Sequence, residues 1–326
     1  MSYSITVENL DWYKQYWVEH QKDFTWEPIF ILPPWLQTWK KHFAPTAETS
    51  VIVTKNTEKI IGFAPLLLAG NSASIIGSPN VCDYEDVITV PGEETGFFKA
   101  LLDFLKQKKI NTLKPGVVRP DSKITSKLLP IAAQSGAEIT CEPDEVSLEK
   151  VLPATWDAYL QTLDAKQRHE VKRKLRRLEE AGKISYRFIT EPASVPEFLE
   201  IFLKMFVESR ADKATFLTKQ AEGFFRDLTM VMAEFGLLRC GILELDKVPV
   251  ASVLAFDYKD TVYLYNSGFD PSQSNLSVGI LSKALLIKDC IDRGKKKFDF
   301  LKGAERYKYH LGGVEVQLQQ CSIKLH

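Results

Sequence analysis

The chain has 326 residues, of which 45% are hydrophobic and 26% charged, and this composition is typical of a soluble globular protein. Lys plus Arg and Asp plus Glu each total 42, so no overall electric field selects a nucleic acid or a membrane as partner. The length exceeds what one core usually needs and suits two domains of ordinary size.

The cysteines and the N-terminus exclude several classes of protein. Five cysteines are scattered and none has Cys-x-x-Cys spacing, so neither a disulfide framework nor a zinc site is indicated. The N-terminus lacks a basic region followed by an apolar segment, and no apolar run approaches the roughly 20 residues of a membrane span. We therefore expect a cytoplasmic protein with no transmembrane segment and no bound metal.

The first half of the chain predicts an alternation of helices and strands. Hydrophobic periodicity and turn residues define these elements. We predict helices at Leu10–Lys22, Trp35–Phe43, a segment from Pro91 to Lys109 and Ser122–Gln134, and strands at Ser50–Lys55, Lys59–Ala69, Ser74–Gly77, Val87–Val90, Thr112–Val118 and Ala137–Leu148.

The second half repeats that order. We predict helices at Pro153–Leu163, Ala165–Ala181, Val195–Arg210 and Lys219–Phe235, and a further helix that ends at Arg293. We predict strands at Ile184–Thr190, Leu237–Leu245, Val248–Asp257, Thr261–Ser267, Lys297–Leu301 and Val314–Leu325. Both halves read as helix, β-hairpin, strand, helix and strand, which indicates duplication. We expect an α/β protein with mixed sheets and two domains, residues 1–150 and 151–326.

The stretch Thr261–Gly303 looks most suited to binding. It reads as strand, polar loop, helix and strand, with Ser277 able to cap the helix and Gly294 able to stop it. A loop that opens a helix delivers free backbone N–H groups and a positive helix end to one place. The loop therefore suits a phosphate or another anion.

Three segments resemble one family of enzymes. They are Tyr265–Pro271 with the following helix, Phe298–Lys308, and Lys166–Arg177 with Gly182; Ser78–Asp86 is similar to that family's Asp-Tyr-x-Asp segment. The chain resembles the GNAT-related acetyltransferases labelled as involved in cellulose biosynthesis, relatives of the Fem-type peptidoglycan aminoacyltransferases. The resemblance implies two tandem GNAT-like domains and transfer of an acyl group from acetyl-CoA or another acyl-CoA to an amine or hydroxyl.

The expected donor loop departs from the usual pattern. Ordinary GNAT enzymes hold the coenzyme A pyrophosphate with a Gln/Arg-x-x-Gly-x-Gly/Ala loop, whereas this chain has Ser274-Asn-Leu-Ser-Val-Gly279. Only the last glycine remains, and fewer glycines restrict the approach of the backbone to a phosphate. Ser277, Val278 and Gly279 are the expected donor contacts. The resemblance adds Lys308 as a phosphate contact, because Fem-type relatives have an aromatic residue and a lysine in a similar place.

Four residues are candidates for the chemistry. Asp299 lies between two phenylalanines on a short strand and either accepts the proton of the nucleophile or forms an ion pair with a lysine of the preceding run. Glu305 is a second candidate base, on a loop or short helix with Tyr307 as a candidate acid for the leaving group. Tyr265, near the loop, would line the acyl channel or simply pack.

The first domain is expected to shape the acceptor cleft. Asp83, Tyr84 and Asp86 are candidate contacts to the incoming substrate, whereas Glu85 is expected in a solvated acidic turn. No nearby His or Cys completes a metal site. The turn before the helix of this half is acidic and would repel a phosphate, so the second domain is expected to carry the donor.

The segment Lys166–Arg177 holds seven basic residues against one acid. Val171, Leu175 and Leu178 form a narrow apolar seam, which leaves the basic side chains on the outer face. A solvated face is the ordinary interpretation of such a run. The alternative is binding of an anionic partner, such as tRNA or a nucleotide-linked or lipid-linked acceptor, with Arg168 and Arg173 as contacts.

We predict an acyltransferase in which the acceptor attacks the donor directly, in polysaccharide or envelope synthesis. Catalysis would come mostly from the positioning of two bound molecules. One alternative is a Fem-type aminoacyltransferase that uses aminoacyl-tRNA, and another is a non-catalytic GNAT-fold binding protein. The acceptor would be a small molecule or a nucleotide-linked or lipid-linked compound, and the sequence sets no oligomeric state.

Overall fold

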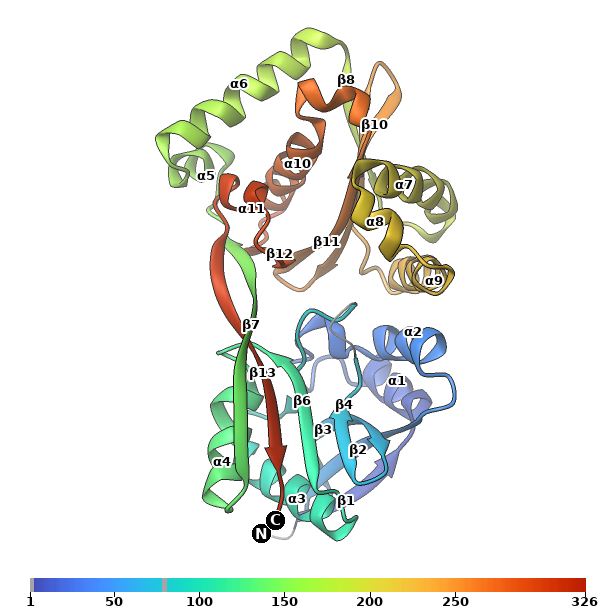
Figure 1. Ribbon diagram of the computed structural model, residues 1–326, viewed down its shortest axis with the longest axis vertical. Coiled ribbons are helices and arrows are strands. Elements are labelled where there is room, and N and C mark those ends of the chain that lie inside the picture. Colours follow the sequence, from blue (N-terminus) through green and yellow to red (C-terminus); the bar gives the residue numbers. More distant parts are fainter. Residues whose placement is uncertain (1–2, 78–80) are drawn as a thin grey trace. The chain divides into compact units, whose positions relative to one another are not determined.

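The computed structural model describes residues 3–77 and 81–326, and these fall into two compact units. Unit 1 consists of Met1–Val146 and Val316–His326, and unit 2 consists of Ser147–Glu315. Figure 1 labels the helices and strands that form them. The final residues, which the sequence assigns to the second domain, thus belong to unit 1.

Unit 1 is built on a mixed sheet in the order β1-β2-β3-β4-β6-β13, with β5 beside β3. Its strands are β1 (Tyr3–Glu8), β2 (Glu48–Asn56), β3 (Lys59–Ala69), β4 (Ser72–Ile75), β5 (Ile88–Thr89), β6 (Thr112–Val118), β7 (Glu138–Val151) and β13 (Val314–Lys324). Its helices are α1 (Leu10–Glu19), η1 (Ile29–Ile31), α2 (Pro33–Phe43), α3 (Glu94–Gln107), the π-helical turn η2 (Ile124–Leu128) and α4 (Leu129–Gln134).

Two cores flank this sheet. On one face, α3 and α4 bury leucine and phenylalanine side chains against β2, β3 and β6. On the other face, the rings of Tyr13, Tyr16, Phe24 and Trp26 lie 5.1–5.5 Å from that of Phe63 on β3. Aromatic residues bury large apolar areas, so this cluster fixes α1 on the sheet.

Unit 2 repeats the arrangement. Its sheet has the order β7-β12-β11-β10-β9-β8. The strands are β8 (Ile184–Ile189), β9 (Cys240–Leu245), β10 (Val248–Tyr258), β11 (Thr261–Phe269) and β12 (Lys297–Lys302). The helices are α5 (Trp156–Thr162), α6 (Ala165–Ala181), η3 (Pro192–Ser194), α7 (Val195–Ser209), α8 (Ala211–Phe216), α9 (Lys219–Glu234), η4 (Pro271–Leu276), α10 (Val278–Asp292) and α11 (Arg306–His310).

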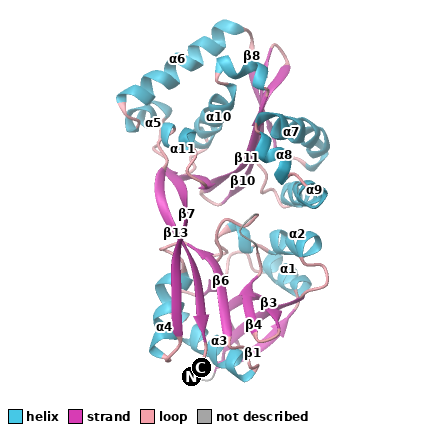
Figure 2. Ribbon diagram, viewed as in Figure 1, coloured by secondary structure: helices cyan, strands magenta, loops and turns pink. Residues whose placement is uncertain are grey.

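Helices cover both faces of the sheet of unit 2. Figures 1 and 2 show α6, α10 and α11 on one side of β10 and β11, and α7, α8 and α9 on the other. The α7 helix packs on β10 and β11, and α10 packs on β9 and β10. Layers of this kind bury the apolar stripe of each helix against a largely apolar sheet.

The duplicated topology is confirmed by the strand pairing. In unit 1, β2, β3 and β4 pair antiparallel and β4 pairs parallel with β6. In unit 2, β9, β10 and β11 pair antiparallel and β11 pairs parallel with β12. A helix connects the two parallel strands each time, namely α3 and α10, as a parallel crossover requires. The mixed α/β architecture predicted from the sequence is therefore correct.

The last strand of each half pairs outside that half. After α4, the end of β7 pairs with β12 in unit 2, where Ser147 lies opposite Lys302. After α11, β13 pairs with β6 in unit 1, where Gln319 lies opposite Val118. A sequence pattern gives the existence of a strand but not its partner, so this exchange was not predicted.

Unit 1 contains a disulfide between Cys141 on β7 and Cys321 on β13. The spacing of the cysteines indicated no disulfide framework, so this bond was not predicted. The residues are 180 positions apart, and only the exchange of β13 brings them together. Cys82, Cys240 and Cys290 are buried and form no disulfide among the described residues.

We predict that reduction of this disulfide lowers the free energy of unfolding of the protein by about 2–4 kcal/mol. The bond restricts the unfolded chain across a long loop, and its loss releases the edge strand β13. Chemical denaturation with and without reductant measures the effect. The double variant Cys141→Ser/Cys321→Ser is the control, and a response to reductant in this variant would assign the effect to another cause.

Candidate functional site

The parallel strands β11 and β12 separate early. Only Thr261–Tyr263 pair with Lys297–Asp299, after which β11 continues along β10 to Phe269 while β12 continues along β7 to Lys302. The far half of β11 therefore has no partner strand on that edge among the described residues. This is the place where the sequence predicts the site.

The loop that follows β11 forms the start of α10. Ser277 adopts a left-handed conformation (φ 59°, ψ 31°), and its hydroxyl makes no capping hydrogen bond, so the predicted capping role of this side chain is wrong. Within the described residues, the N–H groups of Val278 and Gly279 donate to no acceptor. Two backbone donors at a helix start are what an anion would use.

Gly279 lies against an aromatic ring. A Cβ at this position would lie 2.9 Å from Cδ1 of Phe269, which is closer than ordinary packing allows. Its carbonyl accepts hydrogen bonds from Ser282 Oγ at 3.0 Å and from Lys283 Nζ at 2.7 Å. The structure thus gives Gly279 a packing role in addition to the predicted contact with a donor.

Lys283, on α10, is a residue that sequence reasoning missed. Its side chain is only 4% exposed, and its ammonium lies 4.7 Å from the centroid of the Tyr307 ring. Burial, assisted by Lys213 and Lys308 and opposed by Glu305, lowers the pKa of Lys283 to about 7. A lysine inside the apolar stripe of a predicted helix is the signal that could have identified it.

Tyr307, on α11, is half-buried beside Lys283. Burial, and then the nearby Glu305 carboxylate, raise the pKa of Tyr307 far above its ordinary value, against the effect of Arg210. The phenol therefore keeps its proton at neutral pH. A protonated phenol can donate to a leaving group.

Lys308 is almost completely buried, with 2% of its surface exposed. Its ammonium donates to the carbonyl oxygens of Leu301 at 2.9 Å and Lys302 at 2.6 Å, and forms an ion pair with Glu305 at 2.9 Å. Two hydrogen bonds and one ion pair therefore hold the Lys308 ammonium. Lys308 thus fastens α11 to the end of β12, and the predicted phosphate contact would have to displace one of these partners.

The two candidate bases differ in access. Asp299 has no exposed surface, and its carboxylate accepts a hydrogen bond from the Leu301 N–H at 2.9 Å, where the backbone of Leu301 is left-handed (φ 62°). Of the lysines 295–297 expected as alternative partners, Lys297 pairs with Glu149 and Lys295 with Asp257. The Glu305 side chain is 40% exposed, so of the two carboxylates it is the more accessible to a substrate.

Tyr265 packs between aromatic residues. Its ring lies 5.8 Å from that of Phe225 on α9 and 5.5 Å from that of Phe256 on β10. The side chain keeps part of its surface exposed, on the half of β11 that β12 does not cover. Packing is therefore observed, and a role in an acyl channel stays a prediction.

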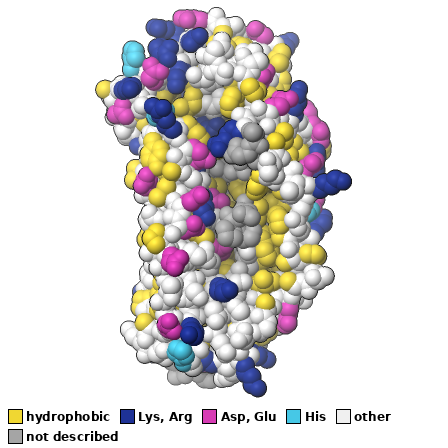
Figure 3. All heavy atoms as spheres, viewed as in Figure 1, with side chains coloured by type: hydrophobic (Ala, Val, Ile, Leu, Met, Phe, Trp, Pro, Cys, Tyr) yellow, Lys and Arg dark blue, Asp and Glu magenta, His cyan; other side chains and the backbone are white. Residues whose placement is uncertain are grey.

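The basic helix predicted at residues 165–181 is α6, with Asp164 as its N-cap. Val171 and Leu178 are buried and Leu175 packs beside them, as predicted. Figure 3 shows Lys and Arg side chains gathered over the part of unit 2 where α6 lies.

The two predicted contacts on α6 have protein partners. Arg173 forms a bidentate pair with Glu170 at 2.8 and 3.0 Å. Arg168 donates to the Leu163 carbonyl at 3.3 Å. Both are partly buried, so Lys172 and Arg177 are the more exposed members of this face.

In unit 1, the acidic segment is mostly buried. Residues 78–80 of the predicted Ser78–Asp86 segment lie outside the described residues. Asp83 is half-buried, and Tyr84 is buried with the Arg119 guanidinium 5.2 Å from its ring centroid. The expectation for Glu85 is wrong, because this residue is 4% exposed and its carboxylate accepts from the Val117 N–H at 2.8 Å.

Asp86 holds the start of the π-helical turn η2. Its carboxylate accepts hydrogen bonds from the N–H groups of Lys123 at 3.0 Å and Ile124 at 3.2 Å. Burial raises the pKa of Asp86 to about 6, although Lys123 and these N–H groups act to lower it. The structure gives Asp86 a capping role, and the predicted substrate contact stays a prediction.

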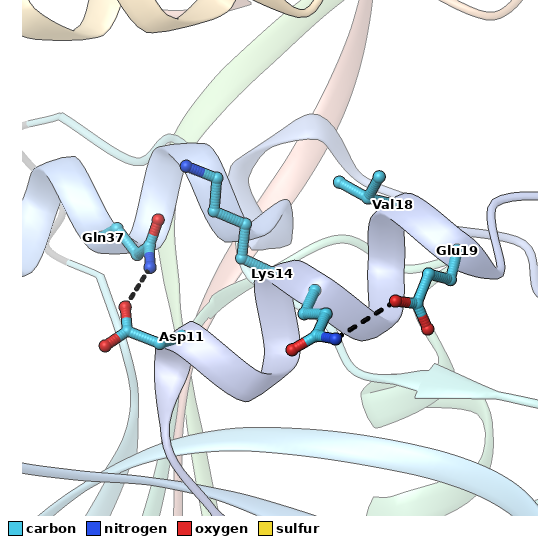
Figure 4. Close-up of a pocket in the computed structure, with 6 residues that line it drawn as sticks. Asp11, Lys14, Val18, Glu19 and Gln37 are labelled. Atoms are coloured by element: carbon cyan, nitrogen blue, oxygen red, sulfur yellow. Dashed lines mark hydrogen bonds between the residues drawn. The ribbon is translucent and has the colours of Figure 1, made fainter.

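A shallow depression lies on unit 1 between α1 and α2 (Figure 4). Gln37 donates to Asp11 at 2.7 Å and Gln15 donates to Glu19 at 3.2 Å, so its polar side chains bond one another. The depression has no nucleophile and no concentration of one charge. We assign it no role.

Neither a metal centre nor a membrane span is seen in residues 3–77 and 81–326. No cluster of three or more His, Cys, Asp or Glu side chains has the arrangement of a metal site. No helix in the same part of the chain combines the length and the apolar character needed to cross a bilayer.

Part of the chain matches a known protein family. Residues 165–309 match the family described as "Acetyltransferase (GNAT) domain". This matched segment contains the diverging strands, the loop before α10, and α11. No curated protein sequence matches the chain.

Solved structures resemble both units together. The crystal structure of FemX has a TM-score of 0.66 at 11% identity and covers 99% of this chain and 97% of its own. A tandem GNAT protein from the clavulanic acid biosynthesis pathway has a TM-score of 0.51 at 10% identity, with coverage of 100% and 99%. L-PGS from Bacillus licheniformis has a TM-score of 0.50 at 10% identity, with coverage of 82% and 81%. At these identities the likeness establishes the GNAT fold and not the substrate.

We predict that the charge on Asp86 reduces the stability of the protein at neutral pH. The folded state holds the Asp86 proton more tightly than the unfolded state, so the free energy of unfolding falls as the pH rises from 3.8 to about 6. The difference between wild type and Asp86→Asn should change by about 3 kcal/mol across this window. Denaturation curves at several pH values measure it.

The exposed Asp103 on α3 provides the matched control for Asp86, as Asp103→Asn. A difference between Asp86→Asn and wild type that does not vary with pH would contradict the assignment.

We further predict that Lys308→Met lowers the free energy of unfolding by about 1–3 kcal/mol, because the Leu301 and Lys302 carbonyl groups lose their donor. Thermal and chemical denaturation measure the loss. Arg306→Met, on the exposed side of the same helix, should leave stability within about 0.5 kcal/mol of wild type. Equal effects of the two substitutions would contradict a fastening role for Lys308.

Proposed function

We propose that the protein is an acyltransferase that moves an acyl group from acyl-CoA to an amine or hydroxyl acceptor. The observation that carries the proposal is the early separation of β11 and β12 inside the segment that matches the acetyltransferase domain. The separation leaves one edge of β11 without a partner strand among the described residues, and α10 in the same unit begins with two free backbone donors and carries Lys283 beside a protonated phenol. These are the parts that acyl transfer requires.

The chemistry would proceed in one displacement. The acceptor nitrogen or oxygen attacks the thioester carbonyl carbon, a new bond to carbon forms, and the carbon–sulfur bond breaks with its electron pair on sulfur. The Tyr307 hydroxyl would give the leaving thiolate its proton. The N–H groups of Val278 and Gly279 would hold an anionic part of the donor.

The proton of the nucleophile needs an acceptor. Glu305 is the better placed of the two proposed bases, because its carboxylate is partly exposed while Asp299 is fully buried. Tyr265 would border the acyl group from the same edge of β11. Asp83, Tyr84 and Asp86 in unit 1 would serve a small or a nucleotide-linked or lipid-linked acceptor, in polysaccharide or envelope synthesis.

A second candidate is transfer from aminoacyl-tRNA. The α6 helix favours it, since Lys172, Arg176 and Arg177 are exposed on one helix of an otherwise neutral chain. Neutralisation of RNA phosphates by such residues gives binding that weakens with salt. Arg168 and Arg173 would contribute only after they exchange their present partners.

Binding of acetyl-CoA followed by release of free thiol tests the first candidate. Ligand at about 100 times its Kd should raise the free energy of unfolding by about 2.7 kcal/mol. With a panel of amines and hydroxyl compounds as acceptors, we expect Tyr307→Phe to lower kcat about 100-fold while it leaves the affinity for acetyl-CoA unchanged. Tyr309→Phe, two residues along on the exposed surface, is the matched control.

This experiment distinguishes acetyl-CoA from aminoacyl-tRNA as the donor. Absence of acetyl-CoA binding at millimolar concentration would exclude the coenzyme A donor. Salt-dependent binding of aminoacyl-tRNA that is lost in Lys172→Ala/Arg177→Ala would then favour the second candidate. Failure of both donors would leave a non-catalytic binding protein with the GNAT fold.

A further inference from the structure

Two lysines from neighbouring helices of unit 2 act on the buried Lys283, whose ammonium lies 4.7 Å from the centroid of the Tyr307 ring. Lys213 comes from α8, Lys283 from α10 and Lys308 from α11, and the charges of Lys213 and Lys308 both act on Lys283. Among the described residues, Glu305 is the one carboxylate that acts on Lys283 in return. With all three lysines protonated, these four side chains carry two excess positive charges.

The three ammonium groups differ in how many protein partners they have. Lys308 donates hydrogen bonds to the Leu301 and Lys302 carbonyl groups and forms an ion pair with Glu305. Lys213 donates to the Ser267 carbonyl and lies 4.8 Å from the centroid of the Phe206 ring.

Lys283 donates one hydrogen bond, to the Gly279 carbonyl, and meets no other hydrogen-bond acceptor in the part of the chain that the structure describes. Two protons of an almost completely buried ammonium group therefore remain for a ligand.

Among the described residues, those of α6, β8, β9 and β10 bring no compensating charge to Lys283. The α6 helix and strands β9 and β10 pack against α10 through apolar side chains, among them Leu178, Leu243 and Val250. Tyr186 on β8 donates its hydroxyl to the Ser282 carbonyl. The charge excess is thus not neutralised from these sides of the helix.

Such an arrangement is unfavourable without a partner. Burial and like charges both act against the protonated form of Lys283, which is why the pKa of this lysine falls to about 7. A bound dianion would remove the repulsion and accept the two unused hydrogen bonds. Charge-assisted hydrogen bonds of this kind are among the stronger ones in proteins.

We propose that Lys213, Lys283 and Lys308 form a binding site for a phosphate-type dianion, and that Lys283 takes up a proton when the anion binds. Lys283 contributes hydrogen bonds, while Lys213 and Lys308 contribute positive charge. The loop before α10 lacks the glycines of an ordinary donor loop, and the lysine side chains would bind the phosphate in their place. Only the natural source of the phosphate rests on the proposed function, and it would be either the coenzyme A donor or the end of an RNA.

Sulfate is the probe for this site, because its charge stays constant between pH 6 and 8.5 and any change of affinity then belongs to the protein. Calorimetric titration of the full chain with sodium sulfate, at constant ionic strength with chloride, gives the Kd. We expect the Kd to rise about tenfold from pH 6 to pH 8.5, as Lys283 loses its proton. Proton uptake should appear as a binding enthalpy that depends on the buffer.

Two substitutions test the residue. Lys283→Met should raise the Kd of sulfate at pH 6 by about tenfold or more. Lys283→Arg, which stays charged, should bind sulfate with an affinity that depends little on pH. Lys288→Met is the matched control, since Lys288 lies on the exposed side of the same helix and pairs with Asp292. Thermal melting of each variant establishes that it is folded.

Several results would overturn the inference: no sulfate binding to wild type at millimolar concentration, binding unchanged in Lys283→Met, or an affinity independent of pH. Competition by coenzyme A or by a short RNA hairpin then identifies the source of the phosphate. The outcome is separate from the proposed function. Acyl transfer without a sulfate site contradicts only this inference, and a Lys283-dependent sulfate site without acyl transfer contradicts only the proposed function.

Discussion

The parallel pairing of β11 and β12 lasts for three residue pairs, and the candidate site depends on where it stops. Beyond that point β12 follows β7, and its register shifts between Asp299 and Leu301, where the Asp299 carboxylate holds the left-handed Leu301. The Lys308 ammonium then binds the last carbonyl groups of β12. These buried contacts fix α11, and α11 in turn holds the ring of Tyr307 next to the Lys283 ammonium. Polar groups that the sequence suggested for chemistry thus act mainly as supports for their neighbours.

Much of the fold could be predicted from local patterns. The strand Thr112–Val118 and the helix Ala165–Ala181 have the predicted bounds, and the mixed α/β class is correct. Such elements are determined locally, by the hydrophobic periodicity of the segment and by the turn residues beside it. The pairing of β13 with β6 and the Cys141–Cys321 bond could not be predicted, because they join segments whose proximity no local pattern expresses.

The site was predicted less completely than the fold. The loop and helix after β11 were located, and Tyr307 was named as an acid, because a polar loop between apolar segments is visible in the sequence. Lys283 was missed, since a lysine in a helix is usually exposed and its burial depends on α11 docking from a later part of the chain. Glu85 was misjudged for the same reason: its partner Val117 is 32 residues away, and the sequence shows only an acidic cluster.

The exchange of terminal strands has a consequence for the order in which the chain can fold as it is synthesised. Unit 2 is one continuous segment, Ser147–Glu315, so it can close before translation ends. Unit 1 waits for the last residues, because β6 lacks its β13 neighbour and the core lacks Cys321, Ile323 and Leu325 until they emerge. During that interval an unpaired strand edge is open to other chains. The part of the protein made first is therefore the part finished last, and a ribosome that stalls near the end would release a complete unit 2 joined to an incomplete unit 1.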